Sequence, residues 1–418
     1  MATVGKTELR SCLALIQRAP DDGEHIHISL SWIDWTEELL GHLADAFGLT
    51  PSETDVLHGF LTSLNQREVA QSRDRSLETI KGQSKSILRK AGCSRISDVV
   101  QLSASIAYLV RQMPQPSKPN VDDWITPKAG MSMLPLSDGR ELAWYRIGNG
   151  SRKVLFIHGY IQGPFVTSSM ARRLAKADIQ LIAPSRPGFG YTSPARSSAT
   201  YDTTCIRDTL ALMAHLDMKR VPICIHQGGS SHGFRIANAL GDQVSGILIV
   251  DGGIPIDEKR HIANMDPQTR FAAMSIRHAP SVMKMVMKLG LPIYRQRGTK
   301  AFLTRQFVMS PRDLETLEQP DLLKVQAQGL FHIVQQGVDA WMHDGRAAMA
   351  DWSRDLDAYQ GPQVWLQAAQ CSIIDAQQVA DHMAGRDGVT FHIVEGHGTN
   401  ILHTAPQLVC DELVRLVE

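Results

Sequence analysis

The residues able to carry out nucleophilic chemistry lie in two short stretches of this 418-residue chain. Gly229-Ser230-Ser231-His232-Gly233 has the spacing G-x-S-x-G, which holds a serine on a sharp turn between a strand and a helix. Near the C-terminus, His397 follows Glu395-Gly396 and has a side chain suited to accept a serine proton. A serine, a histidine and a carboxylate brought together would carry out acyl transfer, as in ester hydrolysis.

The strand that must position this turn leads to Gln227 and not to Ser231. The expected strand from Arg220 to Ile225 runs directly into the turn with no spare residues. Small residues follow where a helix would pack closely against a sheet, namely Gly228, Gly229, Gly233 and Ala237. With Ser231 at the turn, the strand before it would be four residues too long and the stretch before the apolar strand 244–251 four residues too short. A carboxamide has no proton to give up near neutral pH, so Gln227 would not be a nucleophile.

From about Met131 to the end, the chain resembles the α/β-hydrolase superfamily. Besides the turn at Gln227, the resemblance rests on two motifs that follow strands. Strand 153–157 precedes His158-Gly159, and strand 179–184 precedes Ser185-Arg186-Pro187-Gly188-Phe189-Gly190, which is similar to the family's R-P-G-F-G turn. The resemblance implies a mostly parallel sheet with a helical lid at about 254–352. It also implies an oxyanion hole built from the backbone N–H groups of Tyr160 and Gly228.

The same resemblance locates the acid and the histidine of a hydrolase. Strand 364–367 is followed by Ala368-Ala369-Gln370-Cys371, so a thiol stands where the family has a carboxylate. Asp375 lies four residues further on and would serve only after a shift of the loop. His397 follows strand 390–394 and takes the usual place of the catalytic histidine. Because Gln227 and Cys371 replace two of the three groups, we expect no catalytic residues and no enzyme activity.

The pocket under the lid would then bind a ligand without cleaving it. Large, adaptable apolar side chains in the lid segment, among them Met283, Met287 and Trp341, suit a largely apolar molecule. The carboxamide of Gln227 can both donate and accept hydrogen bonds, which matches an ester, lactone or amide. The expected ligand-binding residues are His158, Gly159, Tyr160, His226, Gln227, Gly228 and His397.

A separate N-terminal domain is indicated by a proline-rich boundary. Three prolines between residues 114 and 119 cannot continue a helix and indicate a linker at 113–124. We expect an all-α domain at 1–112 and the ligand-binding domain at 125–418. Residues 1–45 are expected to pack as helices, with a dimer contact as the alternative.

Residues 49–105 resemble the helix-turn-helix domain of the LuxR family, for which we expect a core at 45–108. The match runs through Leu49-Thr50-Pro51-Ser52-Glu53, Asn65-Gln66-Arg67-Glu68-Val69-Ala70 and Ser76-Leu77-Glu78-Thr79-Ile80-Lys81. Thr50 and Glu53 can form a capping box, and Ser76 can cap the second helix. The resemblance implies binding to double-stranded DNA through an outward-facing recognition helix carrying Thr79, Lys81, Gln83, Ser84 and Lys85. Between residues 67 and 95, eight basic residues against three acidic ones suit phosphate contacts.

The composition of the whole chain limits the partners, cofactors and cellular location that we expect for this protein. The 43 basic residues balance the 43 acidic residues, so net charge indicates no partner. Six cysteines are scattered with no C-x-x-C, so neither a zinc site nor a disulfide framework is indicated, and we expect no metal or cofactor. No apolar run approaches membrane-spanning length and the N-terminus lacks a signal-like segment. We therefore expect a soluble cytoplasmic protein with no membrane partner.

These observations predict a ligand-responsive transcriptional regulator. Its non-catalytic domain would sense a small, largely apolar molecule, and the chain would bind paired DNA half-sites as a homodimer. One alternative is an active serine hydrolase that uses Ser231 and His397 and carries an attached DNA-binding domain. The other is a scaffold for protein interaction or dimerisation with an empty pocket.

Overall fold

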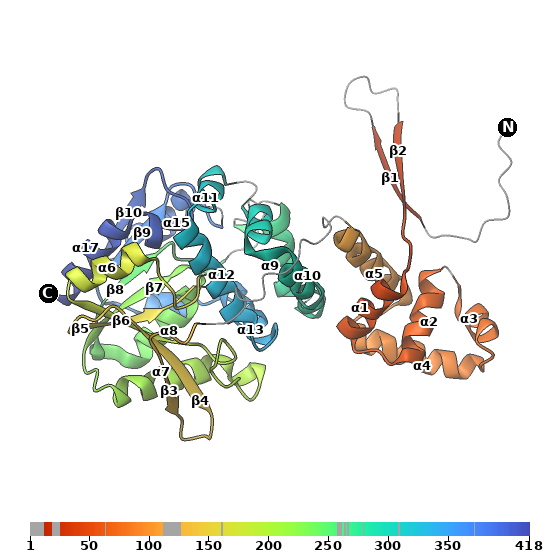
Figure 1. Ribbon diagram of the computed structural model, residues 1–418, viewed down its shortest axis with the longest axis horizontal. Coiled ribbons are helices and arrows are strands. Elements are labelled where there is room, and N and C mark those ends of the chain that lie inside the picture. The colour runs from red at the N-terminus through yellow and green to blue at the C-terminus, as the bar shows by residue number, and fades with distance from the viewer. Residues whose placement is uncertain are drawn as a thin grey trace. The chain divides into compact units, whose positions relative to one another are not determined.

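The chain forms two compact units, the first within residues up to Pro116 and the second within most of the remainder. A computed structural model describes residues 12–18, 26–62, 64–111, 127–159, 162–256, 261–262, 265, 267–278, 280–307, 310–371 and 373–418. Each unit has its own hydrophobic core. Figure 1 shows the two units.

The first unit begins with two strands that the sequence analysis did not predict. Strand β1 (Cys12–Arg18) pairs antiparallel with β2 (Ile26–Trp32), and Cys12 lies opposite Trp32. The expectation of an all-α first domain is therefore wrong for these residues, while residues 1–11 lie outside the described chain. In β2, isoleucine and leucine alternate with histidine and serine, which is the two-residue period of a strand. Helix begins only after β2, at Glu37 of α1 (Glu37–Phe47).

Helices form the rest of the first unit. They are α1 (Glu37–Phe47), α2 (Pro51–Leu61), α3 (Gln66–Ser72), α4 (Leu77–Ala91) and α5 (Ile96–Arg111). Their buried faces share one core, formed by Leu43, Phe47, Val56, Leu57, Phe60, Leu61, Val69, Ala70, Ile80, Ile87, Ala91 and Val99. Both predicted caps are confirmed. Thr50 and Glu53 make the capping box of α2, and the Ser76 hydroxyl accepts from the Thr79 N–H at 3.1 Å.

The second unit is built on an eight-stranded sheet, and the prediction of a mostly parallel sheet is confirmed. The strands are β3 (Met131–Pro135), β4 (Glu141–Ile147), β5 (Arg152–Ile157), β6 (Ile179–Pro184), β7 (Val221–His226), β8 (Val244–Val250), β9 (Gln363–Ala368) and β10 (Val389–Val394). Their order across the sheet is β10-β9-β8-β7-β5-β6-β4-β3. The pairs β3–β4 and β4–β6 are antiparallel and the others parallel, so the carboxyl ends of β5 to β10 lie at one edge of the sheet.

Helices cover both faces of this sheet (Figure 1). One core packs α7 (Tyr201–His215), α8 (Ser230–Leu240), α14 (Ser353–Ala358) and α15 (Ala376–Met383) against it. The core on the other face contains residues of α6 (Ser168–Lys176), α16 (Ile401–Thr404) and α17 (Pro406–Val417). A parallel sheet covered on both faces explains why its central strands, such as β7, are apolar along most of their length.

The segment between β8 and α14 is largely helical. Its helices are α9 (Pro267–His278), α10 (Pro280–Gln306), α11 (Pro311–Thr316), α12 (Pro320–Val334) and α13 (Asp339–Met349). Gly298, with φ +81°, bends α10. We refer to α9–α13 as the lid helices. Among the helices of the described residues, none is both long and apolar enough to cross a membrane.

Candidate ligand-binding site at the turn after β7

The turn after β7 has Gln227 at its apex. Strand β7 is buried throughout and ends at His226, and residues Gln227–Gly229 form one 3₁₀ turn before α8 begins at Ser230. Gln227 has φ +47°, a left-handed conformation that costs free energy for any residue with a Cβ. Ser231 lies in the first turn of α8, where it is 1% exposed. The strained turn that lifts a side chain above the sheet therefore carries a carboxamide.

The small residues after Gln227 allow α8 to lie directly against the sheet. A Cβ added at Gly229 would lie 2.9 Å from the carbonyl oxygens of both Ile157 and His158. One added at Gly233 would lie 2.3 Å from the Ile225 side chain. Real Cβ atoms do not approach backbone oxygens so closely, so the close packing of this helix requires glycine at 229.

The side chain of Gln227 is buried and forms a hydrogen bond within the second unit. It is 2% exposed, and its Nε2 donates a hydrogen bond of 2.8 Å to the Thr399 carbonyl. Its Oε1 faces Gly159, where an added Cβ would lie 2.9 Å from that oxygen. Gln227 and Gly159, both predicted to bind ligand, are thus brought together.

His397 does not take part in this contact. It is partly exposed, and its Nδ1 lies 2.9 Å from the Thr404 hydroxyl. Its carbonyl accepts from the Gln370 N–H at 3.1 Å. The hydrogen bond from Gln227 reaches Thr399, two residues further along the same loop. The loop that carries His397 therefore contacts the Gln227 turn through the backbone carbonyl of Thr399. The imidazole of His397 contacts Thr404 instead.

The two candidates for the acid position are not arranged to polarise His397. Burial, together with the negative charge of Asp251, raises the pKa of Cys371 to about 12, so its thiol is neutral. Asp375 is exposed, and its carboxylate caps α15 by accepting from the Gln378 N–H at 3.0 Å. Neither side chain supplies the carboxylate that orients a catalytic histidine.

Asp251, which the sequence analysis did not select, carries a buried carboxyl beside the site. It directly follows β8, has φ +51° and is 4% exposed. Its two oxygens accept from the N–H groups of Ala368 and Ile401 at 2.9 and 3.2 Å. Burial raises its pKa to about 8 although these hydrogen bonds act in the opposite direction. The sequence carries a signal for this residue, because Asp251 is an acid directly after a buried apolar strand.

The loop after β5 contributes His158, whose ring is fully buried. Its Nδ1 lies 3.0 Å from the Gly159 carbonyl. Burial and the neighbouring Arg186 charge hold the pKa of His158 well below its usual range, so the ring is neutral. Tyr160, the predicted oxyanion donor of this loop, lies outside the described residues. The other predicted donor, Gly228, is partly buried in the turn.

The backbone of His226 lies beside Gly159, but its side chain packs away from the other predicted ligand-binding residues. Its ring stacks on Phe156 at a centroid distance of 6.3 Å and meets the edge of His403 at 6.2 Å. Phe156 belongs to the core on the α6 and α17 face of the sheet. Burial lowers the pKa of His226 well below its usual value, so this side chain is a neutral core residue.

A buried ion pair joins the turn after β6 to the lid. Arg186 contacts the carboxylate of Asp344 on α13 and donates to the His158 carbonyl at 2.6 Å. Tyr201 and His232 also contact Asp344, at 2.9 and 3.0 Å. Burial alone would raise the pKa of Asp344, but Arg186 and His232 outweigh it and lower the pKa below its usual range. This cluster anchors α13 over the loop of His158.

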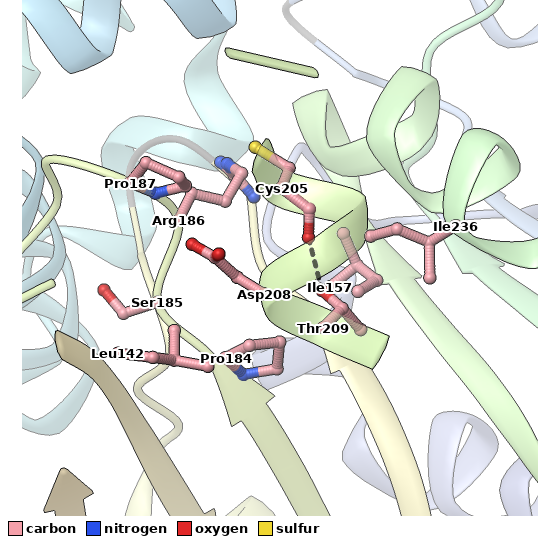
Figure 2. Close-up of a pocket in the computed structure, with 10 residues that line it drawn as sticks. All are labelled: Leu142, Ile157, Pro184, Ser185, Arg186, Pro187, Cys205, Asp208, Thr209 and Ile236. Carbon is pink, nitrogen blue, oxygen red and sulfur yellow. Dashed lines mark hydrogen bonds between the residues drawn. The ribbon is translucent and has the colours of Figure 1, made fainter. Parts of the chain in front are cut away.

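The cavity beside Arg186 is small. Its lining comes from β4 to β6, α7 and α8, and consists of Leu142, Ile157, Pro184, Ser185, Arg186, Pro187, Cys205, Asp208, Thr209 and Ile236 (Figure 2). Its volume is about 10 Å³, close to the room that one water requires. A larger open groove of about 570 Å³ lies at the amino ends of β7 and β8, lined by residues such as Arg220 and Val244. That end of the strands is opposite Gln227.

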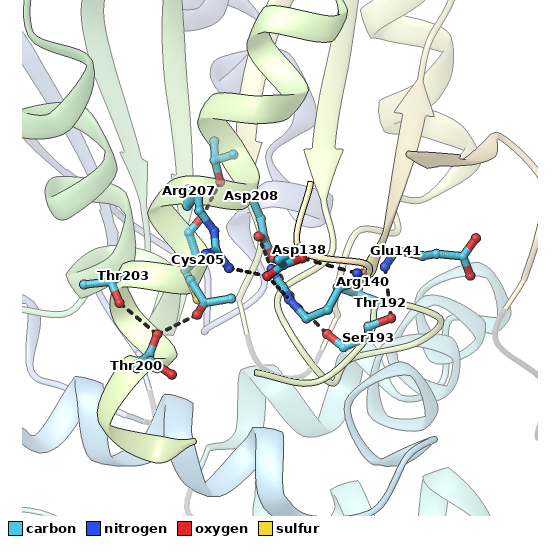
Figure 3. A network of polar contacts seen from close by, with 12 residues as sticks. Asp138, Arg140, Glu141, Thr192, Ser193, Thr200, Thr203, Cys205, Arg207 and Asp208 are labelled. Atoms are coloured by element: carbon cyan, nitrogen blue, oxygen red, sulfur yellow. Dashed lines mark hydrogen bonds and ion pairs between the residues drawn. The ribbon is translucent and has the colours of Figure 1, made fainter. Parts of the chain in front are cut away.

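A second polar network, shown in Figure 3, has a structural role. Arg140 donates through both Nη atoms to the carboxylate of Asp208 on α7, and through Nε to Asp138 at 2.9 Å. Arg207 reaches the same Asp138 at 2.6 Å. The Ser193 hydroxyl accepts from the Glu141 N–H at 3.0 Å. These contacts tie the β3–β4 turn to α7 and to the loop after β6.

Three of the five residues predicted to face DNA are exposed. Thr79, Lys81 and Lys85 are exposed on α4. Gln83 is partly buried and donates to the Ser52 hydroxyl at 2.7 Å. Ser84 contradicts the prediction, because it is 2% exposed and donates to the Ile80 carbonyl at 2.7 Å. It lies between Ile80 and Ile87 on the buried stripe of α4, where a polar side chain is tolerated since it bonds to its own helix.

The fold and the strained turn define the class of this protein. Residues 154–415, more than half of the chain, match the Alpha/beta hydrolase family, and the chain belongs to that family. A curated relative, an uncharacterized hydrolase of Saccharomyces cerevisiae, is 28% identical over 122 residues, which are 28% of this chain and 41% of the yeast protein. The matched segment thus spans less than half the length of that relative.

Solved structures show the same fold. Cfl2 of Burkholderia cenocepacia has a TM-score of 0.52 at 16% identity, covering 69% of this chain and 95% of its own. An esterase of a Rhodococcus species has a TM-score of 0.50 at 14% identity, covering 69% and 98%. At such identities the likeness shows the fold alone.

Proposed function

We propose that this protein is a ligand-responsive transcriptional regulator whose α/β-hydrolase domain binds a small molecule without hydrolysing it. The observation that carries the proposal is the side chain at the strained turn. Gln227 has φ +47° and a buried carboxamide bonded to Thr399, in the place that a hydrolase of this fold gives to its nucleophile. A carboxamide can hold a ligand by hydrogen bonds but cannot attack a carbonyl carbon.

The remaining catalytic positions support the same proposal. Cys371 is a neutral thiol, and Asp375 is used as a helix cap. His397 bonds to Thr404, and among the described residues no carboxylate is hydrogen-bonded to its imidazole. The alternative hydrolase, built on Ser231, receives no support from the geometry, because Ser231 lies inside α8 with 1% exposure.

The first unit would provide the DNA-binding function in the cytoplasm. Helix α3 ends at Ser72 and α4 begins at Leu77, and α4 carries the exposed side chains Thr79, Lys81 and Lys85. Four exposed basic residues on α3, on α4 or between them form no ion pair with another described residue. They are Arg67, Arg75, Lys85 and Arg89. Such groups can contact phosphates while α4 occupies a major groove, and a homodimer would present two copies to paired half-sites.

For the ligand to act as a signal, it must favour one arrangement of the regulator over another. A molecule that binds two conformations equally shifts neither. The proposed effector is a small, largely apolar molecule that binds beside Gln227 under the lid helices.

The test is ester hydrolysis by the purified full chain. The substrates are p-nitrophenyl acetate, butyrate and octanoate, assayed beside His397→Ala and Ser231→Ala variants. We expect all three proteins to show the same background rate. A rate that falls in either variant would identify the domain as an enzyme and refute the proposal.

A further inference from the structure

A groove of about 570 Å³ lies at the amino ends of β7, β8 and β9, at the opposite end of these strands from Gln227. Arg220 directly precedes β7, Asp242 lies in the turn before β8, and Gly361 lies in the connection between α14 and β9. Small-molecule sites have volumes of about 300–1,000 Å³, so this groove has room for a ligand of its own. All of its lining residues belong to the second unit.

Tyr359 contributes a buried hydroxyl to this groove. The residue is 8% exposed, and its ring packs edge-on against Phe234 at a centroid distance of 6.1 Å. Among the described residues, none forms a hydrogen bond with this hydroxyl. A Cβ at Gly361, which also lines the groove, would clash with the hydroxyl oxygen, so glycine leaves that side of it uncovered. Burial raises the pKa of Tyr359 to about 12, so the hydroxyl keeps its proton and can both donate and accept. A ligand that bonds to it recovers the cost of burying an unpartnered polar group.

Two opposite charges also line the groove. The guanidinium of Arg220 and the carboxylate of Asp242 are both exposed. They precede neighbouring strands, yet within the described part of the chain neither side chain forms an ion pair or a hydrogen bond. The carboxyl end of α8 adds negative charge, because the last carbonyls of a helix carry partial negative charge and the last turn of α8 contains no basic residue. The groove therefore offers one cation and a group of negative partners.

Small apolar side chains form another part of the lining. They are Ala237 of α8, Val244 of β8 and Ala358 of α14. An aliphatic chain placed on them would lose contact with water, which is favourable. A purely anionic ligand would leave Asp242 without a partner, and a purely cationic one would leave Arg220 without a partner. The lining thus fits a molecule that carries a carboxylate, an ammonium group and a short aliphatic part.

We propose that this groove is a second binding site and that its ligand is a free amino acid with an aliphatic side chain. Arg220 binds the carboxylate, while Asp242 and the last carbonyls of α8 bind the ammonium group. The Tyr359 hydroxyl adds a hydrogen bond to the bound molecule, and the aliphatic side chain covers Val244 and its apolar neighbours. This inference goes beyond the proposed function, because the groove is separate from the turn of Gln227 and its occupation requires no DNA binding.

The test compares leucine with two analogues that each lack one of its charges. Isocaproate retains the carboxylate and the aliphatic chain without the ammonium group, whereas isoamylamine retains the ammonium group without the carboxylate. Each is titrated calorimetrically into the full-chain wild type. We expect leucine to bind at least about fivefold more tightly than either analogue, because an ion pair at an exposed site contributes up to about 1 kcal/mol.

Variants of the lining show where leucine binds. Arg220→Gln, Asp242→Asn and Tyr359→Phe should each weaken its binding about threefold or more. Tyr359→Phe retains the ring and removes only the hydroxyl. Lys219→Gln and Asp217→Asn are the matched controls, because they remove the same charges from a neighbouring exposed pair that does not line the groove. Both controls should bind leucine as the wild type does.

The analogues also distinguish the two charged partners. Arg220→Gln should weaken isocaproate and leave isoamylamine unchanged, and Asp242→Asn should do the reverse. The inference is overturned if leucine does not bind to the wild type, or if both analogues bind as tightly as leucine. It is equally overturned if the three lining variants keep the wild-type affinity for leucine, or if the two controls lose as much affinity as they do.

Discussion

The side-chain amide of Gln227 donates a 2.8 Å hydrogen bond to the backbone carbonyl of Thr399, 172 residues further along the chain. This bond joins the turn after β7 to the loop after β10. In a working hydrolase of this fold, those two segments hold the nucleophile and the histidine. Here the same two segments are fastened to each other by a donor and an acceptor, and Thr399 extends the connection to Asp313 of the lid.

Replacing Gln227 by glutamate should destabilise the second unit. A glutamate there would face the Thr399 carbonyl as a second acceptor when ionised, or would have to take up a proton against its ordinary pKa, and both cost free energy in a buried place. We expect the free energy of unfolding to fall by about 1–3 kcal/mol or more, measured by urea titration followed by near-ultraviolet circular dichroism. Gln319→Glu is the matched control, since Gln319 is exposed and its side chain makes no capping bond. Equal stability of the two variants would contradict this role of Gln227.

The sheet and the position of Gln227 could be predicted because they depend on local patterns. Strand β7 is a short apolar run with no room for a different register, and the glycines after it are the residues that helix-to-sheet contact requires. The caps at Thr50 and Ser76 were predictable for the same reason, since a capping side chain bonds only to residues within the next turn.

The rest of the site could not be predicted, because its contacts join distant segments. Asp313 lies 86 residues from Thr399, and nothing near it in the sequence distinguishes it from an exposed helix acid. A polar residue such as Ser84 is expected on the outer face of α4, but its hydrogen bond to the Ile80 carbonyl allows it to be buried. The strand β2 had a two-residue period, but its neighbours were strongly helical.

Removing the Asp344 carboxylate should be more disruptive than removing an exposed one. Asp344→Ala leaves the buried Arg186 without its counter-charge and removes the acceptor of Tyr201 and His232. Breaking a buried pair in this way costs about 3–5 kcal/mol. Asp357→Ala, which breaks the exposed pair with Arg386, is the control and should cost less than about 1 kcal/mol. Chemical denaturation of both variants compares the two costs, and similar values would mean that the Asp344 cluster does not anchor the lid.

Asp251 should make the stability of the second unit depend on pH. Its pKa is about 8 in the folded protein against an ordinary value of 3.8, so the folded chain holds a proton that the unfolded chain releases between these values. Since the unfolded state binds fewer protons in this range, the free energy of unfolding from this group falls as pH rises from about 4 to 8. The slope should flatten in Asp251→Asn, measured by urea unfolding at several pH values, and should persist in the exposed control Asp357→Asn. A slope unchanged by Asp251→Asn would show that another group causes it.

Loss of the exposed lysines of α4 should weaken DNA binding by the full chain. Lys81 and Lys85 are exposed on one helix, and Lys81 has only a 3.4 Å contact with the exposed Glu78. If α4 occupies a major groove, Lys81→Ala plus Lys85→Ala should reduce retention of a DNA site selected from a random pool. The double variant should also have a shallower dependence of affinity on salt, because each lost phosphate contact lowers the slope by about 0.9. Lys176→Ala plus Lys219→Ala removes the same charge from exposed positions in the second unit and is the matched control. If both double variants keep the wild-type affinity and salt slope, α4 is not the DNA-contacting helix.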